Sequence, residues 1–163
     1  MRTLLVLALA ALAPAAAAQQ KIGYVDSDAI LDRMPEYRTV QQELDRLAAQ
    51  WQAEVDAATA EGDRMASEFA AREILFTDEE RERQLAAVVA KRQEADALRR
   101  RYFGPEGELF REQQTRLRPV QERLLSAVET VATDGEFDYV FDRAGDYLFL
   151  YTRPRHNLTD LVL

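Results

Sequence analysis

The sequence contains few side chains that could carry out chemistry. His156 is the single histidine, there is no cysteine, and the run Arg-Pro-Arg-His-Asn holds no second histidine or spaced carboxylate that could complete a zinc site. Asp26 and Asp28 stand where turn and capping groups are common, and no spacing brings together a nucleophile, a base and an orienting group. The sequence therefore predicts no catalytic residue, no metal site and no bound cofactor.

The charge balance narrows the range of partners. The chain has 29 acidic and 21 basic residues, a net charge of −8, which becomes −9 if Arg2 is removed with an export signal. Nucleic acid requires clustered positive charge, so the composition argues against nucleic-acid binding and makes contact with an anionic membrane doubtful. We expect the one basic run to be a solvated helix face paired with acidic residues of the neighbouring helix. Its members are Lys91, Arg92, Arg99, Arg100 and Arg101.

Residues 1–18 are typical of a secretory signal peptide. Arg2 is followed by an apolar run of signal length and then by small residues up to Ala18 that suit a cleavage site. A membrane-spanning helix requires about 20 apolar residues, and Pro14 interrupts the run short of that length. We therefore expect export and cleavage near Ala18. Because the chain lacks cysteine, helix packing or self-association must stabilise it in place of disulfides.

The following residues predict a strand, a short helix and a long coiled-coil helix. Residues 21–26 alternate as in a strand, and Ser27 can cap a short helix that runs through Met34 and ends at Pro35. From Glu36 onward, apolar and small residues recur about every 3.5 to 3.6 positions, a narrow stripe that suits one partner helix. The stripe comprises Tyr37, Val40, Leu44, Leu47, Trp51, Val55, Ala58, Gly62, Met65 and Phe69.

A second helix of matching length follows a tight tip. Thr77 and Glu80 fit a capping box, so the first helix should end near Glu73 and the second should begin at Asp78. The run at 104–107, Gly-Pro-Glu-Gly, should kink or break this second helix. Two equal helices joined by a short turn must lie antiparallel over roughly 60 Å. The second stripe comprises Leu85, Val88, Arg92, Ala95, Leu98, Tyr102, Leu109, Gln113, Leu117, Val120, Leu124, Val128 and Val131.

The C-terminal part predicts a small β-containing base. Residues 137–142 and 147–152 have strand composition, a turn is expected at 143–146, and Asn157 can begin a short last helix. We therefore predict a mainly α fold with a small β body, of the α+β class. A helical hairpin arm (36–118, tip near 74–77) should project from a base formed by 19–35 and 119–163.

The predicted base is too small to be stable alone. It has 62 residues, whereas one core suffices above roughly 70 to 80 residues, and its edge strands would be exposed. Self-association through the β segments answers both problems, although helices of the same chain could cover the sheet instead. The candidate interface residues are Ile22, Tyr24, Val25, Phe137, Tyr139, Phe141, Leu148 and Leu150.

The mature chain resembles the Skp (OmpH) family of periplasmic chaperones along essentially its whole length. The resemblance rests on residues 21–26 after a signal peptide, the tip sequence 75–81, the return stretch 117–120, and the closing pattern of 137–142 with 157–160. It implies a periplasmic homotrimer with a shared β body, whose arms surround a cavity that holds unfolded outer-membrane proteins without ATP or a cofactor. The acidic arm, the break at 104–107 and the short last helix depart from the family's pattern.

Apolar side chains that the helix seam does not need are the candidate client contacts. Ile74, Leu75 and Phe76 are three consecutive apolar residues in the tip turn, although they could instead fold back and close the hairpin. Tyr102 and Phe103 form a second candidate patch beside the break, where core packing is the favoured alternative because Tyr102 lies on the stripe.

A second interpretation shares every local feature. In it the chain is a structural or adaptor coiled-coil protein of the cell envelope, whose hairpin tip docks one specific partner. The two interpretations differ in what binds. A chaperone suppresses the aggregation of unrelated unfolded membrane proteins, whereas an adaptor binds one folded protein in a fixed ratio.

Overall fold

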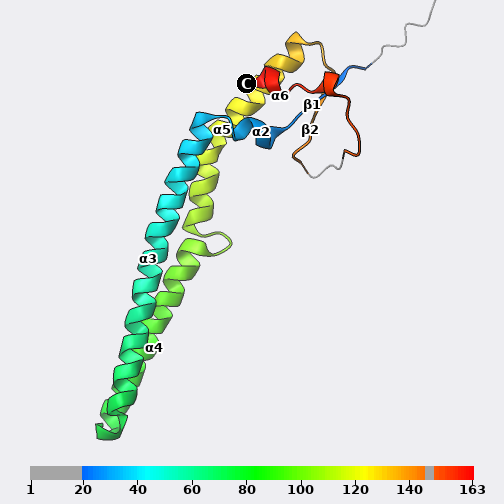
Figure 1. Cartoon of the computed structure of the whole chain (residues 1–163). Helices are drawn as coiled ribbons and strands as arrows, with labels where there is room; N and C mark the ends of the chain where they lie inside the picture. Colours follow the sequence, from blue (N-terminus) through cyan, green and yellow to red (C-terminus); the bar gives the residue numbers. More distant parts are fainter. Residues whose placement is uncertain (1–19, 146–148) are drawn as a thin grey trace, which may run out of the picture.

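The computed structural model describes residues 20–145 and 149–163, so the predicted signal peptide lies outside the described residues. Figure 1 shows a long helical hairpin with a small body at one end. This confirms the predicted α+β fold class with a projecting antiparallel hairpin. The elements are β1 (Ile22–Val25), α2 (Ser27–Leu31), α3 (Pro35–Arg72), η1 (Glu73–Leu75), α4 (Asp78–Phe103), α5 (Glu108–Asp134), β2 (Tyr139–Asp142), η2 (Pro154–His156) and α6 (Thr159–Val162).

The arm is held together by one apolar seam between α3 and the returning helices. Every residue of the first predicted stripe is buried or half-buried, and Leu44 and Val55 are almost fully enclosed. On the returning helices the buried positions recur with the same period, at Val88, Ala95, Tyr102, Val120 and Leu124. The second stripe is wrong at Leu85, which is 49% exposed, and at Gln113, which is exposed as well.

Arg92 can occupy a seam position because a glycine faces it. A Cβ on Gly62 would lie 3.3 Å from the Cγ of Arg92, so the aliphatic stem of Arg92 fills the space above Gly62. The guanidinium then reaches past the seam and donates to Asp63 at 3.2 Å. The charge therefore stays in solvent while the stem packs, as is common for long basic side chains.

The tip forms as the capping signal predicts. The η1 turn leads into Thr77, whose hydroxyl accepts from the Glu80 backbone N–H while the Glu80 carboxylate accepts from the Thr77 N–H at 3.0 Å. These two hydrogen bonds satisfy donors at the start of α4 that have no partner within the helix. The Glu80 carboxylate accepts from the Thr77 backbone N–H and also from the Thr77 hydroxyl, and these two bonds, the backbone one first, hold the pKa of Glu80 below its ordinary value.

The run Gly104-Pro105-Glu106-Gly107 breaks the second helix into α4 and α5. Gly104 N–H donates to Arg100 O and Gly107 N–H donates to Gly104 O, both at 2.9 Å. A Cβ on Gly107 would lie 2.7 Å from Tyr102 O, so this turn requires glycine there. Arg101 pairs with Glu108 across the break at 2.7 Å. The turn projects from the hairpin, while α3 runs past it without interruption (Figure 1).

The body packs a two-stranded parallel sheet against the far end of α5. β1 pairs with β2 so that Ile22 faces Tyr139, and Tyr24 makes an isolated bridge to Asn157. The buried residues of the core are Val25, Ile30, Leu124 and Leu158. Since Leu124 comes from α5, which runs without interruption through Pro119, one helix serves both the arm and the body.

Three local predictions in the body are wrong. Residues 149–152 form no strand, and Tyr24 is bridged by Asn157 on that side of the sheet. The cap of α2 is Asp26, whose carboxylate accepts from Ala29 N–H at 3.0 Å, and not Ser27. The helix ends at Leu31 and not at Met34. A carboxylate is a stronger acceptor than a hydroxyl, and Ser27 Oγ is already engaged as a donor to Asp142.

The seam should dominate the stability of the arm. Leu44→Ala leaves a cavity at a position only 3% exposed, so the free energy of unfolding should fall by about 2 to 5 kcal/mol in urea denaturation followed by circular dichroism. Leu85→Ala, at an exposed position of the partner helix, is the matched control and should change it by less than about 0.5 kcal/mol. Equal losses in both variants would contradict the seam described here.

Candidate functional site

The tip presents two bare apolar side chains at the end of the arm. Ile74 is 91% exposed and Leu75 is 75% exposed. Phe76 behaves differently, because its ring stacks on Phe69 of α3 with centroids 6.0 Å apart and is half-buried. Phe76 therefore closes the hairpin end, the alternative noted from the sequence, and the free apolar surface belongs to Ile74 and Leu75.

One flank of the arm beside the tip is strongly charged. Arg64 donates to Glu61 at 2.7 Å and also to Glu68, both on α3. The hydrogen bond from Arg64 is the largest cause that holds the pKa of Glu61 below its ordinary value. Glu61 therefore stays ionised at neutral pH. The exposed tip is thus apolar at its end and zwitterionic just above it.

The aromatic residues beside the break are mostly seam residues. Tyr102 is 7% exposed, and its ring stacks on Trp51 with centroids 4.9 Å apart and planes 4° apart. Its hydroxyl donates to Glu54 at 2.7 Å. Because Tyr102 is buried, its side chain is not accessible to a client. Phe103 is half-buried and meets Tyr102 edge-on, so part of its surface stays accessible.

The hydrogen bond to Glu54 has an electrostatic consequence. It is the largest cause that raises the pKa of Tyr102, and burial and the charge of Glu54 act in the same direction. The phenol must give up its hydrogen bond and face a carboxylate when it ionises. Tyr102 therefore stays protonated to higher pH in the folded arm than in the unfolded chain.

The candidate interface residues of the body divide into buried and exposed sets. Val25 lies in the chain's own core, so its side chain is not accessible to a second chain. Tyr24 is only 7% exposed, so little of its surface could contact a second chain. Phe137 is half-buried, and Leu148 lies outside the described residues. The residues that remain exposed are Ile22, Tyr139, Phe141 and Leu150.

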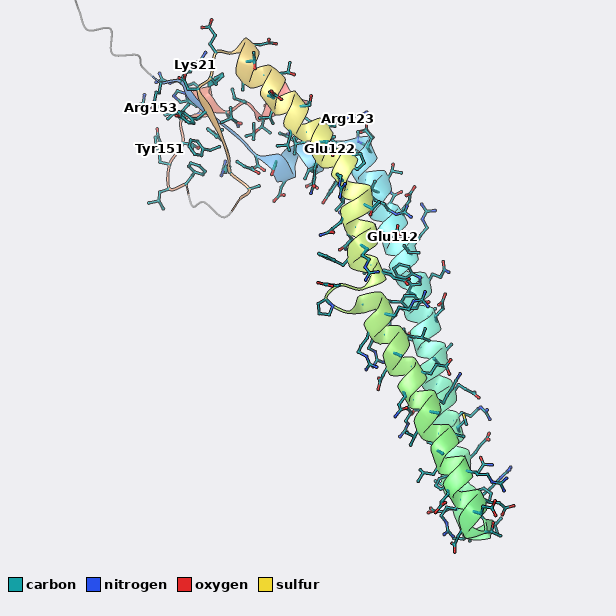
Figure 2. The ribbon with its side chains drawn as sticks, turned by 180° about the vertical axis from the view of Figure 1, so that it is seen from behind. Lys21, Glu112, Glu122, Arg123, Tyr151 and Arg153 are labelled. Atoms are coloured by element: carbon teal, nitrogen blue, oxygen red, sulfur yellow. The ribbon has the colours of Figure 1, made fainter. Side chains whose placement is uncertain are left out.

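An apolar hollow of about 380 Å³ opens on this side of the body. Tyr24 and Phe141 line it from the sheet, and Phe149 meets Phe141 edge-on from the following segment. Tyr151 and His156 also line it, and neither was singled out from the sequence as an interface residue. Figure 2 places Tyr151 and Arg153 together beside the sheet. The aromatic and aliphatic composition of 149–152 was a usable signal, but it predicted a strand and not the lining of a hollow.

The basic run is a solvated face, as expected, but most of its pairs lie on its own side of the hairpin. Lys91 pairs with Glu94 and Arg99 with Asp96 within α4, and Arg101 pairs with Glu108 of α5. Of the pairs found for this run in the described residues, the one to α3 is that of Arg92 with Asp63. Exposed pairs of this kind contribute little stability.

Two negative findings concern the described residues alone. In residues 20–145 and 149–163, no helix has both the length and the apolarity that crossing a bilayer requires. Over the same ranges no group of three or more histidine, cysteine, aspartate or glutamate side chains is placed to hold a metal ion.

Comparison with known proteins gives one family and one structural neighbour. A family model described as outer membrane protein (OmpH-like) matches residues 21–163. A crystal structure from Caulobacter crescentus, of a protein described as a candidate OmpH-like outer membrane chaperone, superposes with a TM-score of 0.70 at 19% identity and covers 88% of this chain and 81% of its own. At that identity the neighbour shows the fold. A search of curated proteins found no match.

The phenol of Tyr102 should give the arm a pH-dependent stability. Because its pKa is raised on folding, its contribution is fully present below the ordinary tyrosine pKa of about 10 and is lost as pH rises through the folded value. Tyr102→Phe keeps the stack on Trp51 and lacks the titrating group. The stability advantage of the unaltered chain, measured in urea with the fluorescence of its single tryptophan, should therefore stay constant up to about pH 9 and shrink as pH rises above about 10. An advantage that grew with pH would contradict the assigned hydrogen bond.

Proposed function

This chain belongs to the OmpH-like family of outer membrane proteins, and we propose that it is an ATP-independent holdase chaperone of the periplasm. In this proposal it binds unfolded outer-membrane proteins and prevents their aggregation. The observation that carries the proposal is a long arm, built on one narrow seam, that ends in the exposed pair Ile74 and Leu75. Exposed apolar residues at the end of a solvated rod serve contact with another molecule.

The arm suits weak contact with many sequences. Its apolar exposed side chains are separated along the helices and sit in no deep pocket, so each contributes a small and unspecific affinity. Several such contacts made together hold a client, and each can be lost and remade without ATP because the others keep the client near. In this proposal, client contact belongs to an arm, about 36–118. Assembly belongs to a body formed by 19–35 and 119–163.

We propose that three copies assemble through the body. Ile22, Tyr139 and Phe141 are exposed beside the apolar hollow, and β2 pairs with β1 on one side. A neighbouring chain that covers the hollow would bury these residues and complete the sheet edge. Closure of three bodies would leave the arms around a common space. Leu148 stays a candidate interface residue in this proposal.

The holdase proposal predicts suppression of aggregation. A urea-unfolded β-barrel outer-membrane protein, diluted into buffer with a stoichiometric excess of the mature chain, should scatter little light, whereas it should aggregate without the chain. Ile74→Asp with Leu75→Asp should weaken this suppression, because carboxylates replace the apolar tip. Ala71→Asp, an exposed position on α3 near the tip, is the matched control and should keep it.

Two results would count against the holdase. Unchanged aggregation in excess of the unaltered chain would remove the proposal. Saturable binding of one folded envelope protein, lost in the tip variant and accompanied by no protection of unfolded clients, would favour the adaptor.

The trimer predicts a solution mass three times that of the mature chain. Phe141→Asp should shift the mass, measured by light scattering after gel filtration, toward that of a single chain, because a buried carboxylate in the interface has no partner. Asp160→Ala, at an exposed site away from the hollow, is the control and should leave the mass unchanged. A single-chain mass for the unaltered protein at micromolar concentration would refute the assembly.

A further inference from the structure

A surface of α5, just past the break, runs along the edge of the seam, where Leu117 is half-buried and its neighbours on that surface are exposed. Phe110 is 43% exposed there although it is a large aromatic residue. It heads a shallow groove of about 410 Å³ that is lined by α5 alone. The residues of this α5 groove are Phe110, Gln113, Gln114, Leu117, Arg118 and Gln121.

The groove occupies one flank of α5, and ion pairs join the other flank to α3. Arg116 donates to Glu43 at 2.8 Å and Arg123 pairs with Glu36, both across the hairpin. Glu112 accepts from Arg116 on the same flank, and Figure 2 shows Glu112 and Arg123 along this helix. The groove residues are spaced by three, four and seven positions, so they share the opposite flank.

Three neutral amides give the groove an unusual chemistry. Gln113, Gln114 and Gln121 make no side-chain hydrogen bond within the described residues, whereas Gln52 of α3 donates to Asp56 at 2.8 Å. A glutamine amide both donates and accepts. An unfolded chain presents a backbone N–H donor and a C=O acceptor at nearly every residue, and these groups have no partner within the chain. The amides therefore match the main chain of any sequence, while Phe110 and Leu117 offer apolar contact to its side chains.

The groove belongs to α5, which is the helix on the body's side of the hairpin (Figures 1 and 2). The body is displaced from the hairpin axis toward the side of α5 away from α3, and the turn at 104–107 projects toward the same side in both views (Figures 1 and 2). α5 begins directly after that turn. A client held beneath the body would therefore meet α5 before it met α3.

We propose that the α5 groove binds an extended segment of unfolded polypeptide. Its main chain would pair with the amides of Gln113, Gln114 and Gln121, and its apolar side chains would pack on Phe110 and Leu117. This inference rests on the holdase function and assigns part of its client site. This pairing does not depend on the client's sequence, because the glutamine amides hydrogen-bond to its backbone and not to its side chains.

A photo-crosslinker locates the client directly. Benzoylphenylalanine is placed at Gln114, or at Gln42 as the matched control, in the full mature chain. Gln42 is an exposed glutamine of α3 next to Glu43, which pairs with Arg116, so both positions lie at the same height on the arm. Irradiation with a urea-unfolded β-barrel protein should crosslink Gln114 to the client and leave Gln42 uncrosslinked. Crosslinks from Gln114 to a second copy of the chain, with or without client, would show an interface and overturn the proposal.

A charge substitution measures the contribution of the amides. Gln114→Glu keeps the shape of the side chain but removes its N–H donors. It also adds a carboxylate, which would lose its hydration when a client occupies the groove. Client affinity should fall about tenfold, or ~1.4 kcal/mol, while Gln42→Glu, with the same charge change, should keep the affinity of the unaltered chain. If the unaltered chain protects clients and the two variants bind equally, the groove proposal fails and the holdase stands. If the unaltered chain gives no protection, both fail.

Discussion

The narrow apolar seam between α3 and the returning helices is the constraint on which the rest of the structure depends. A stripe of this width can bury one partner helix and nothing more. The small residues Ala58, Gly62 and Ala95 are buried along this stripe, and a Cβ on Gly62 would lie 3.3 Å from Cγ of Arg92 on the facing helix. The arm, which lies wholly within the described residues, is therefore two helices across and has no second layer around them. Whatever the arm binds must be bound on an outer face.

The continuity of α3 determines what the break at 104–107 does. α3 spans 38 residues without interruption and lies opposite the gap between α4 and α5. Trp51 stacks on Tyr102 at the end of α4, and Arg101 pairs with Glu108 at the start of α5, so both sides of the gap are held. The break therefore redirects a few residues outward, and α5 then returns to the seam with Val120 and Leu124 buried. At the start of α5 the half-buried apolar residue is Leu109, and its neighbour Phe110 is exposed.

The elements that depend on local signals could be predicted from sequence, and those that depend on pairing could not. The capping box at Thr77 and the apolar period of α3 are encoded within a few residues, and both form as expected. The strand expected at 147–152 needs a partner edge, and within one chain Asn157 takes the place beside Tyr24. The spacing already placed Phe110 beside the predicted stripe, which takes Leu109, but the groove that Phe110 lines depends on the side chains around it in three dimensions. The backward fold of Phe76 onto Phe69 likewise depends on the tip's three-dimensional course.

Under the holdase proposal, the spacing of the exposed patches bears on how a client would be held. About 30 helical residues separate Leu75 from Phe110, or about 45 Å at 1.5 Å per residue. An extended chain covers about 3.3 Å per residue, so about 14 residues are needed to reach from one patch to the other. A segment of that length is available in an unfolded β-barrel protein but not in a folded one, whose strands are already paired. Simultaneous contact at both patches therefore favours extended clients over folded proteins. A client that folds shortens its reach and loses one contact, which is a route to release that requires no ATP.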